Sequence, residues 1–429
     1  MPDRTAPEPR TAFTPRADAI LSTVMLGFWA AVTLWQQWGL WAEDLSAVYI
    51  AGWLWQNGQP DLIYATPPAF FGGVAESWFP AMEALGLSGK TSFAYVYPPI
   101  WAALTAPLTN ILSPQGFLDA VALVQIPLLA VSVVLAGRLL KPEAMPWWVW
   151  TAIGLVILNL SIQSHVAIWY NQPTITTGFL ILLAFERLGV GRPITAGAAL
   201  ALAAAIKLTP AAFVLIFLLD RQVRAAVAFA IVGGALGLMS ILLAGWPAHA
   251  DFLASLHKVA SVVYLIAINV SLKPALFAAG SSLGLLPHVD PAASEHIYTD
   301  LPAWIGPALS IAAAALILGF ARILAPLDGR LRRGVGVLAL SIIVALFGPL
   351  GWLHYYLMPM LLLPGLLGLL PPRAALAVIA PVSLLSLALV FADIHVPPWP
   401  IASYVWLASA SWLAVLAGLF VAAARRSAS

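Results

Sequence analysis

Long apolar runs, separated by short polar stretches, make up most of this chain. A helix needs about 20 apolar residues to cross the hydrocarbon core of a bilayer. The runs that approach this length are 19–38, 117–139, 146–163, 170–186, 223–245, 302–322, 334–350, 352–370, 374–392 and 402–424. With two irregular stretches counted in, the pattern predicts an all-α polytopic membrane protein of about 12 transmembrane helices.

The two irregular stretches do not have the length of a single span. The stretch 98–112 is too short, and we expect a helix that enters only half of the membrane. The stretch 193–219 is too long and is broken near Pro210, so we expect two short helices with Lys207 at the turn between them. Irregular backbone at membrane depth is tolerated only where it lines protein or water, which makes the Lys207 break a candidate site.

The longest polar interruption covers 41–97. Loops in compact structures are usually about 4–6 residues long, so a segment of this length is more than a connector. It carries six charged residues, which are Glu43, Asp44, Asp61, Glu76, Glu83 and Lys90. Its aromatic residues suit the headgroup level of a membrane, and they include Trp41, Trp53, Trp55, Trp78 and Tyr95. We expect interfacial helices here that form an active-site cap together with a second outer loop, 246–301.

Basic residues indicate which side of the membrane each loop faces, because cytoplasmic loops carry an excess of lysine and arginine. The residues so placed in the cytoplasm are Arg138, Lys141, Arg187, Arg192, Arg221, Arg224, Arg322, Arg330, Arg332, Arg333, Arg373, Arg425 and Arg426. Acidic residues gather in the loops left outside, at Asp251, Asp290, Glu295, Asp300 and Asp393. We expect a disordered cytoplasmic tail over 1–17 and one membrane domain over 18–429.

Composition supports a membrane protein and excludes other classes. The 429 residues are 62% hydrophobic and 9% charged, with a mean hydropathy of +0.93. Soluble chains carry about 25% charged residues. The chain has no cysteine, which excludes disulfides and Cys-ligated metals. It also has no basic stripe interleaved with aromatics, so we predict no nucleic-acid binding.

Metal and nucleotide motifs are missing as well. Apart from one histidine discussed below, the histidines are scattered at His165, His249, His257, His288, His296 and His395. None forms an H-x-x-x-H pair, there is no D-x-D pair, and we expect no metal site. There is no Walker-type glycine loop, no GxGxxG opening a helix, and no internal repeat of the kind that marks many transporters.

Asp44 is the first candidate for chemistry, since it follows the predicted outer end of the first span. A carboxylate in a low-dielectric pocket can act as a general base. The alternative is an acidic residue that only complements a helix N-terminus. Glu43 competes with it for either role, but on a helix its side chain points about 100° away, so only one of the two can face a given site.

Lys207 and His354 are cationic candidates. A buried ammonium inside a bilayer is expensive and calls for an anionic partner, which could be a substrate phosphate; the alternative is a lysine that reaches an interface. His354 and Tyr355 lie at the predicted outer end of a span, where their donors suit a phosphate or a sugar hydroxyl, or where the histidine is structural. Two polar islands at predicted outer helix ends could bind sugar hydroxyls or cap helices. They contain Asn171 with Gln172, and Asn269 with Ser271 and Lys273.

An ordered series of short motifs from about residue 40 to 360 resembles a known family. The pieces are Asp44 with Tyr49-x-Ala51-Gly52, Gly58-x-Pro60-Asp61-Leu62-Ile63-Tyr64, Phe93-x-Tyr95-x-Tyr97-Pro98-Pro99, Asn171-Gln172, Ala196-Gly197, Lys207-Leu208-Thr209-Pro210, Asn269-Val270-Ser271-Leu272 and Pro349-x-x-Trp352-x-His354-Tyr355. This set resembles the bacterial membrane glycosyltransferases of family 87, which have the GT-C fold. The chain departs from the family at Asn171-Gln172, where Gly-Gln is more usual, and at Asn269-Val270-Ser271, where Asn-Gln-Ser is more usual.

The resemblance implies a fold, a reaction and a site. The fold would be a GT-C-type helix bundle, and the reaction an inverting transfer of a sugar, mannose above all, from a polyprenyl-phosphate donor to a lipid or glycan acceptor. It would run on the outer face of the bacterial cytoplasmic membrane without a metal cofactor. By this likeness Asp44 is the catalytic base. Donor phosphate would meet Lys207, His354 and Lys273. Sugar or acceptor would meet Glu43, Tyr97, Asn171, Gln172, Asn269 and Tyr355.

Two other classes remain open from the sequence. A lipid or sugar transporter or flippase would also explain the broken helix at Lys207, but it leaves the acidic, aromatic outer segment without a purpose. A non-catalytic membrane subunit of a cell-envelope assembly predicts no donor binding at all. Release of polyprenyl phosphate in detergent separates an enzyme from a transporter, which turns over only across a sealed bilayer.

Overall fold

The computed structural model describes residues 14–67, 70–71, 73–287, 297–395 and 401–428, and 77% of the chain is helical. The helices up to the Lys207 break are α1 (Pro15–Gln37), α2 (Glu43–Gln56), η1 (Pro60–Leu62), η2 (Glu76–Trp78), α3 (Phe79–Ala84), α4 (Pro99–Thr105), η3 (Ala106–Asn110), α5 (Pro114–Leu140), α6 (Trp147–Leu160), α7 (Ile162–Trp169), α8 (Thr174–Gly189) and α9 (Pro193–Ile206). Those after it are η4 (Thr209–Phe213), α10 (Val214–Leu219), α11 (Val223–Ser261), α12 (Leu272–Ser282), α13 (Ile305–Leu324), α14 (Gly329–Phe347), η5 (Leu353–Tyr356), α15 (Leu357–Leu362), η6 (Leu363–Gly368), α16 (Pro372–Leu385), α17 (Ala388–His395) and α18 (Ile401–Ala428).

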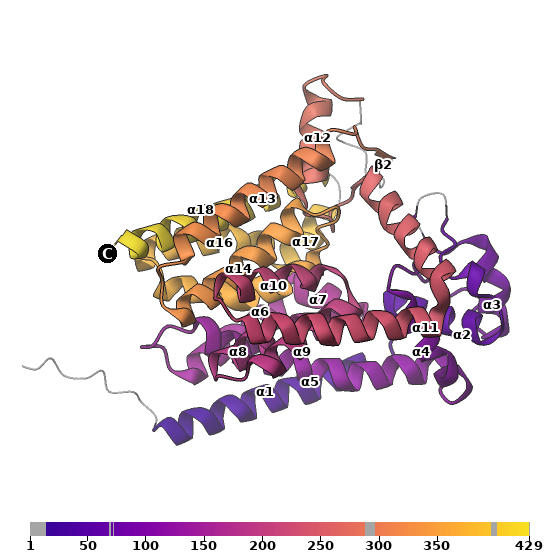
Figure 1. Ribbon diagram of the computed structural model, residues 1–429, viewed down its shortest axis with the longest axis horizontal. Helices are drawn as coiled ribbons and strands as arrows, with labels where there is room; N and C mark the ends of the chain where they lie inside the picture. Colours follow the sequence, from indigo (N-terminus) through magenta and orange to yellow (C-terminus); the bar gives the residue numbers. More distant parts are fainter. Residues whose placement is uncertain (1–13, 68–69, 72, 288–296, 396–400, 429) are drawn as a thin grey trace, which may run out of the picture.

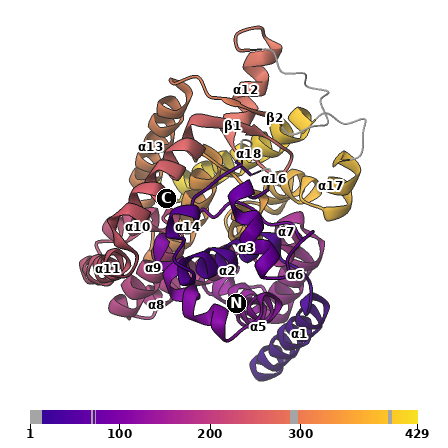
Figure 2. The same cartoon turned by 90° about the vertical axis from the view of Figure 1, so that its right-hand side faces the viewer.

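The helices form an elongated bundle (Figure 1). The start of α1 and the end of α18 lie at one end, whereas α2, α3 and α4 lie at the other. Seen from that second end, α2 and α3 occupy the middle of the face, with α12 and β2 at its margin (Figure 2). The segment 41–97 therefore covers one end of the bundle, where the sequence predicted a cap.

A small β-ribbon corrects the expectation of a purely helical chain. Strand β1 (Val262–Leu265) pairs antiparallel with β2 (Ile297–Asp300), so that Val262 lies opposite Asp300. The ribbon lies in the segment 246–301, which the sequence predicted as a second outer loop. In the structure this segment begins with the last part of α11. Helix α11 turns at Gly245, whose φ of 74° favours glycine, and then continues to Ser261. The predicted end of the span 223–245 coincides with this turn.

Five helices in the described part of the chain are long and apolar enough to cross a membrane, and these are α1, α5, α11, α13 and α18. The predicted count of about 12 spans is therefore not confirmed. Several predicted spans are interrupted: 146–163 is divided at Ser161, 374–392 between α16 and α17, and 352–370 consists of short helical pieces. The first break is stabilised across the bundle, because the N–H of Ile162 donates to the carbonyl of Ser386 at 2.7 Å.

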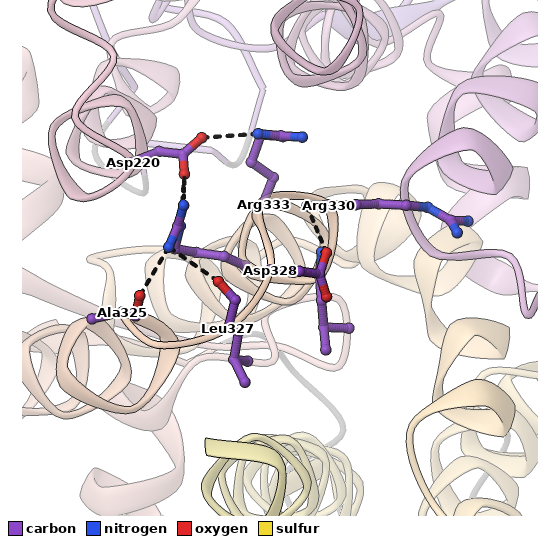
Figure 3. Close-up of polar contacts among 8 residues, drawn as sticks. Asp220, Ala325, Leu327, Asp328, Arg330 and Arg333 are labelled. Carbon is purple, nitrogen blue, oxygen red and sulfur yellow. Dashed lines mark hydrogen bonds and ion pairs between the residues drawn. The ribbon is translucent and has the colours of Figure 1, made fainter. Parts of the chain in front are cut away.

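The predicted break at Lys207 is confirmed. Helix α9 ends at Ile206, Lys207 is extended with φ −140° and ψ 140°, and η4 begins two residues later with Pro210 in its first turn. The returning piece, η4 and α10, ends at Asp220. Its carboxylate is paired with Arg332 and Arg333 of α14 (Figure 3). The chain thus goes in and comes back to the same end of the bundle, as the sequence predicted.

The cap differs from the predicted surface layer. Helix α2 is buried along Leu45–Leu54 and packs against α4 and η3, because it is apolar on nearly all sides. Trp78 and Tyr95, expected at the headgroup level, are fully buried inside the cap. The Trp78 indole donates to the carbonyl of Leu62 at 2.7 Å, so this ring supports the cap from within.

The N-terminal boundary is also earlier than expected. Helix α1 begins at Pro15, and the hydroxyl of Thr14 accepts a hydrogen bond from the N–H of Ala17. Residues 15–17, assigned to a disordered tail, are therefore helical. The rest of that predicted tail, 1–13, lies outside the described residues, and so do Asp290 and Glu295 of the predicted outer loop.

Candidate functional site

Asp44 lies in the first turn of α2, at the base of the cap. Its Oδ1 accepts a hydrogen bond from the Tyr97 hydroxyl at 2.9 Å, and its Oδ2 accepts one from the amide of Gln172. Tyr97 comes from the extended segment before α4, and Gln172 comes from the turn between α7 and α8. Three segments far apart in sequence thus meet at one carboxylate.

Lys207 lies on the other side of Gln172. Its ammonium donates to Oε1 of Gln172 at 3.2 Å and to the hydroxyl of Thr174 at 3.1 Å. It also lies over the rings of Tyr97 and Tyr355, 5.4 and 5.1 Å from their centroids. Cations are attracted to such ring faces. Within the described part of the chain these two acceptors use two of its three N–H groups, which leaves one for a ligand.

His354 is close to this cluster and lacks polar partners. The residue is 5% exposed, and the centroids of its ring and the Tyr355 ring are 4.8 Å apart, with the two planes nearly perpendicular. Neither ring nitrogen has a hydrogen-bond partner among the described residues. A buried polar group without a partner is unusual and calls for an explanation. Its proximity to Lys207 allows both to meet one anion.

Asn171 supports the site from behind. It has φ 48°, a left-handed conformation in which asparagine is enriched. Its side chain donates to the carbonyl of Leu118 at 2.9 Å and accepts from the amide of Gln125 at 3.1 Å. These contacts anchor the turn to α5, and the structure does not bring the Asn171 amide to Asp44. Its predicted contact with a sugar has no geometric support.

Asn269 likewise has a backbone role. Its Oδ1 accepts from the N–H of Gly351 at 2.9 Å, and its Nδ2 donates to the carbonyl of Tyr264 at 2.9 Å. The residue is fully buried. It ties the loop before α12 to the segment that leads into η5, and so it positions His354 and Tyr355 without joining the cluster.

Glu43 and Lys273 also lie apart from the cluster. Glu43 accepts from the hydroxyl of Thr91 at 2.5 Å, on a different side of α2 from the Asp44 contacts, as helical geometry predicted. Lys273 donates to the carbonyl of Ala260, in the last turn of α11, at 2.8 Å, and to that of Val262, just after this helix, at 3.3 Å. Burial lowers the pKa of Lys273 to about 8.

Burial raises the pKa of Asp44, while the Lys207 charge and the Tyr97 hydroxyl act in the opposite direction. The pKa of Tyr97 is well above its ordinary value, because the ring is buried and faces the negative charge of Asp44. Tyr97 therefore stays protonated and donates. The arrangement gives a carboxylate with an increased affinity for protons, held in place by two donors.

An open, mostly apolar groove is lined by Lys207 and Tyr355, and the free space in it, open solvent included, is about 520 Å³. Its walls come from α8, η4, α14 and α15, and they include Thr177, Gly178, Ile181, Pro210, Phe213, Val344, Ala345 and Met358. A smaller hollow of about 230 Å³ shares Thr174, Gly178 and Met358 with it. A mostly apolar groove that is lined by one lysine suits an anion that carries a hydrocarbon tail.

Sequence reasoning missed Thr174. This residue opens α8, lines the groove and accepts from Lys207. The available signal was the polar run Asn171-Gln172-Pro173-Thr174 at a predicted outer helix end. Within the described residues no three His, Asp or Glu side chains are placed to hold a metal ion together.

The comparison with protein families identifies the class of protein. The profile of glycosyltransferase family 87 matches residues 95–353, which is more than half of the chain. The chain belongs to glycosyltransferase family 87, and it is a membrane glycosyltransferase. Neither the search of curated proteins nor the search of solved structures gave a match. Asp44 and His354 lie outside the matched range, so their roles rest on geometry.

Proposed function

We propose that this protein transfers a sugar, mannose in the first instance, from a polyprenyl-phosphate donor to a hydroxyl of a lipid or glycan acceptor, with inversion. The observation that carries the proposal is the joint position of Asp44 and Lys207. One amide connects them, and Lys207 lines a mostly apolar groove. A base and a phosphate-binding cation are the two groups this reaction requires.

The proposed step is a single displacement. The acceptor oxygen forms a bond to the anomeric carbon of the donor sugar, and the bond between that carbon and the phosphate oxygen breaks. The acceptor proton passes to Asp44, and the electron pair of the broken bond stays on the polyprenyl phosphate. Lys207, with one N–H group free for a ligand, stabilises the phosphate charge that develops. His354 is a second donor candidate, and Lys273 is not, because backbone carbonyls hold it.

The apolar groove supports a lipid-linked donor over a soluble sugar nucleotide. Its lining is mostly apolar, and of its polar residues Thr174 and Tyr355 contact Lys207. A polyprenyl chain lying there would present its phosphate to the ammonium. We propose that positive charge from Lys207 takes the place of a divalent cation, so that transfer needs no metal.

We place the reaction on the outer face of the bacterial cytoplasmic membrane. The support is that α2, whose first turn carries Asp44, lies at the end of the bundle opposite the arginine-rich end, where α18 finishes with Arg425 and Arg426 (Figure 1). Arginine-rich ends face the cytoplasm in most membrane proteins. The acceptor would reach Asp44 from the aqueous side, beneath the cap.

The test uses purified protein in detergent with radiolabelled polyprenyl-phosphate sugars and total membrane lipid or glycan as acceptor. We expect release of polyprenyl phosphate together with a labelled, inverted product, also in the presence of a chelator. Asp44→Asn is the matched inactive control. If no donor in the panel is consumed in detergent, the proposal fails and a transporter, which needs a sealed bilayer, becomes the better candidate.

A further inference from the structure

We infer that Gln172 is a positioning residue that couples the phosphate-binding lysine to the catalytic base. The observation is a continuous chain of hydrogen bonds from Lys207 through the amide of Gln172 to Asp44. This inference rests on the proposed function and assigns to Gln172 a role other than direct contact with sugar. The residue is 1% exposed, so its amide serves groups of the protein.

The orientation of the amide follows from the charges on its two sides. A carboxylate only accepts hydrogen bonds, and an ammonium only donates them. The NH₂ group must therefore face Asp44, and the carbonyl oxygen must face Lys207. The reverse orientation would place two acceptors together at Asp44 and two donors together at Lys207. The positive charge of Lys207 thus fixes the orientation of the Gln172 amide, and this orientation points the NH₂ donor at Asp44.

The bridge has a defined effect on the base. A hydrogen bond to the ionised form of a carboxyl favours that form and lowers its pKa. Burial acts on Asp44 in the opposite direction, and the hydrogen bond that the Gln172 amide donates works against that effect. Lys207 strengthens the contact because a cation at the carbonyl polarises the amide, as expected for hydrogen-bond chains. The hydrogen bond from Gln172 therefore favours the ionised form of Asp44, and it holds Oδ2 in one direction before the acceptor arrives.

The backbone around Gln172 is built to hold this amide in place. Asn171 fixes the turn to α5, and Thr174, two residues after Gln172, accepts the second hydrogen bond of Lys207. Tyr97 holds Oδ1 of Asp44 independently of this turn. Removal of the Gln172 amide therefore frees one oxygen of the base and leaves its other contact intact.

The experiment measures the titration of Asp44 directly. Infrared difference spectra of the purified full chain, recorded across pH, give the protonated-carboxyl band that is missing in Asp44→Asn. We compare wild type with Gln172→Met, which removes the amide, and with Gln172→Glu, which keeps the shape but adds a negative charge. Gln163→Met is the matched control, because Gln163 is also a buried glutamine but bonds Ser386.

We expect the Asp44 midpoint to rise by about one pH unit or more in Gln172→Met, and at least as far in Gln172→Glu, with Gln163→Met unchanged. The acid limb of transfer against pH should move by the same amount, and activity should recover as pH rises. An unmoved midpoint, or a loss of transfer that is equal at every pH, overturns the inference. The titration needs no donor, so its result is independent of whether the proposed function holds.

Discussion

The two ends of the bundle hold buried carboxylates in different ways. At the arginine-rich end, Asp220 is 7% exposed and is paired with both Arg332 and Arg333, the latter at 3.0 Å (Figure 3). Arg332 also donates to the carbonyls of Ala325 and Leu327. Glu186 repeats the pattern between Arg138 and Arg187. Guanidinium groups compensate each of these negative charges, and the ion pairs hold different helices together.

At the capped end, Asp44 has neutral donors instead. Tyr97 and Gln172 hold its two oxygens, and Lys207, whose charge acts on it, is connected to it by hydrogen bonds through the Gln172 amide. Among the described residues no guanidinium pairs with Asp44, so it can accept a proton, and Lys207 keeps one N–H group for a ligand. The comparison teaches that a carboxylate saturated by arginines stabilises structure, whereas one held by neutral donors is available for chemistry.

The largest expected effect comes from Asp44→Asn. The change is nearly isosteric, and it removes the group that we propose takes the acceptor proton. General-base contributions are about 100- to 10,000-fold in rate, so transfer should fall by that factor while donor binding persists. Measured rates of the purified variant check this. Activity within a few-fold of wild type would mean that Asp44 is not the general base, and Glu43 would be the next carboxylate to test.

The pH dependence of the wild type follows from the same residue. Burial raises the pKa of Asp44, and the base acts only when it is ionised. Transfer should therefore be maximal above this pKa and fall about tenfold per pH unit below it, with a midpoint above the ordinary carboxyl value of about 3.9. Rates of transfer across pH, at saturating donor, measure the midpoint. An acid limb at or below the ordinary value would contradict the proposed environment of Asp44.

The next effect concerns Lys207. Lys207→Met keeps much of the stem but removes the charge, and loss of one preorganised donor to developing charge costs about 100-fold. Lys207→Arg should recover part of the activity, since the charge returns in a planar shape. Donor binding and transfer by the two variants check this. Lys273→Met is the contrast: it should lower stability and leave transfer per folded molecule unchanged, and the opposite result would move the phosphate site to Lys273.

A smaller effect on activity, but a clear one on stability, is expected at the arginine-rich end. Asp220→Asn removes the charge between two guanidinium groups, which costs about 3 kcal/mol when a buried pair is broken. Unfolding in detergent should occur at lower temperature, with transfer per folded molecule close to wild type. Asp328→Asn, at the N-cap of α14, should change stability by less than about 1 kcal/mol, because asparagine also caps helices. Loss of transfer activity per folded molecule in Asp220→Asn would contradict the proposed difference between the two ends.

The mildest changes test on which sides of the membrane the two ends lie. The chain has no cysteine, so single cysteines can be placed without background. Asp61, Glu76 and Lys90 are exposed in the cap, and Arg330 is exposed at the arginine-rich end. An impermeant thiol reagent outside the cell should label cysteines at the first three positions at once and at Arg330 only after lysis. The reverse labelling pattern would contradict the proposed orientation of the protein in the membrane.

The sequence alone determined the features that depend on local order. Hydrophobic length and interruption predicted the membrane character, the break at Lys207, the end of a span at Gly245 and a polar cap before Pro99. Proline chemistry and the cost of irregular backbone in a bilayer act over a few residues, so they can be read along the chain. The same logic predicted that Asp44 and Glu43 cannot both face one site, and the structure places the two side chains on different contacts.

Only the tertiary structure decided which polar residues share a site. Gln172 is 128 residues from Asp44 in sequence, and packing of α2 against the turn between α7 and α8 brings them together. Packing also gave Asn171, Asn269 and Lys273 backbone partners, and it buried Trp78 and Tyr95 inside the cap. A polar side chain at a helix end has the same local pattern whether it meets a ligand or a carbonyl. The difference lies in which buried donors and acceptors remain unsatisfied once the helices are in place.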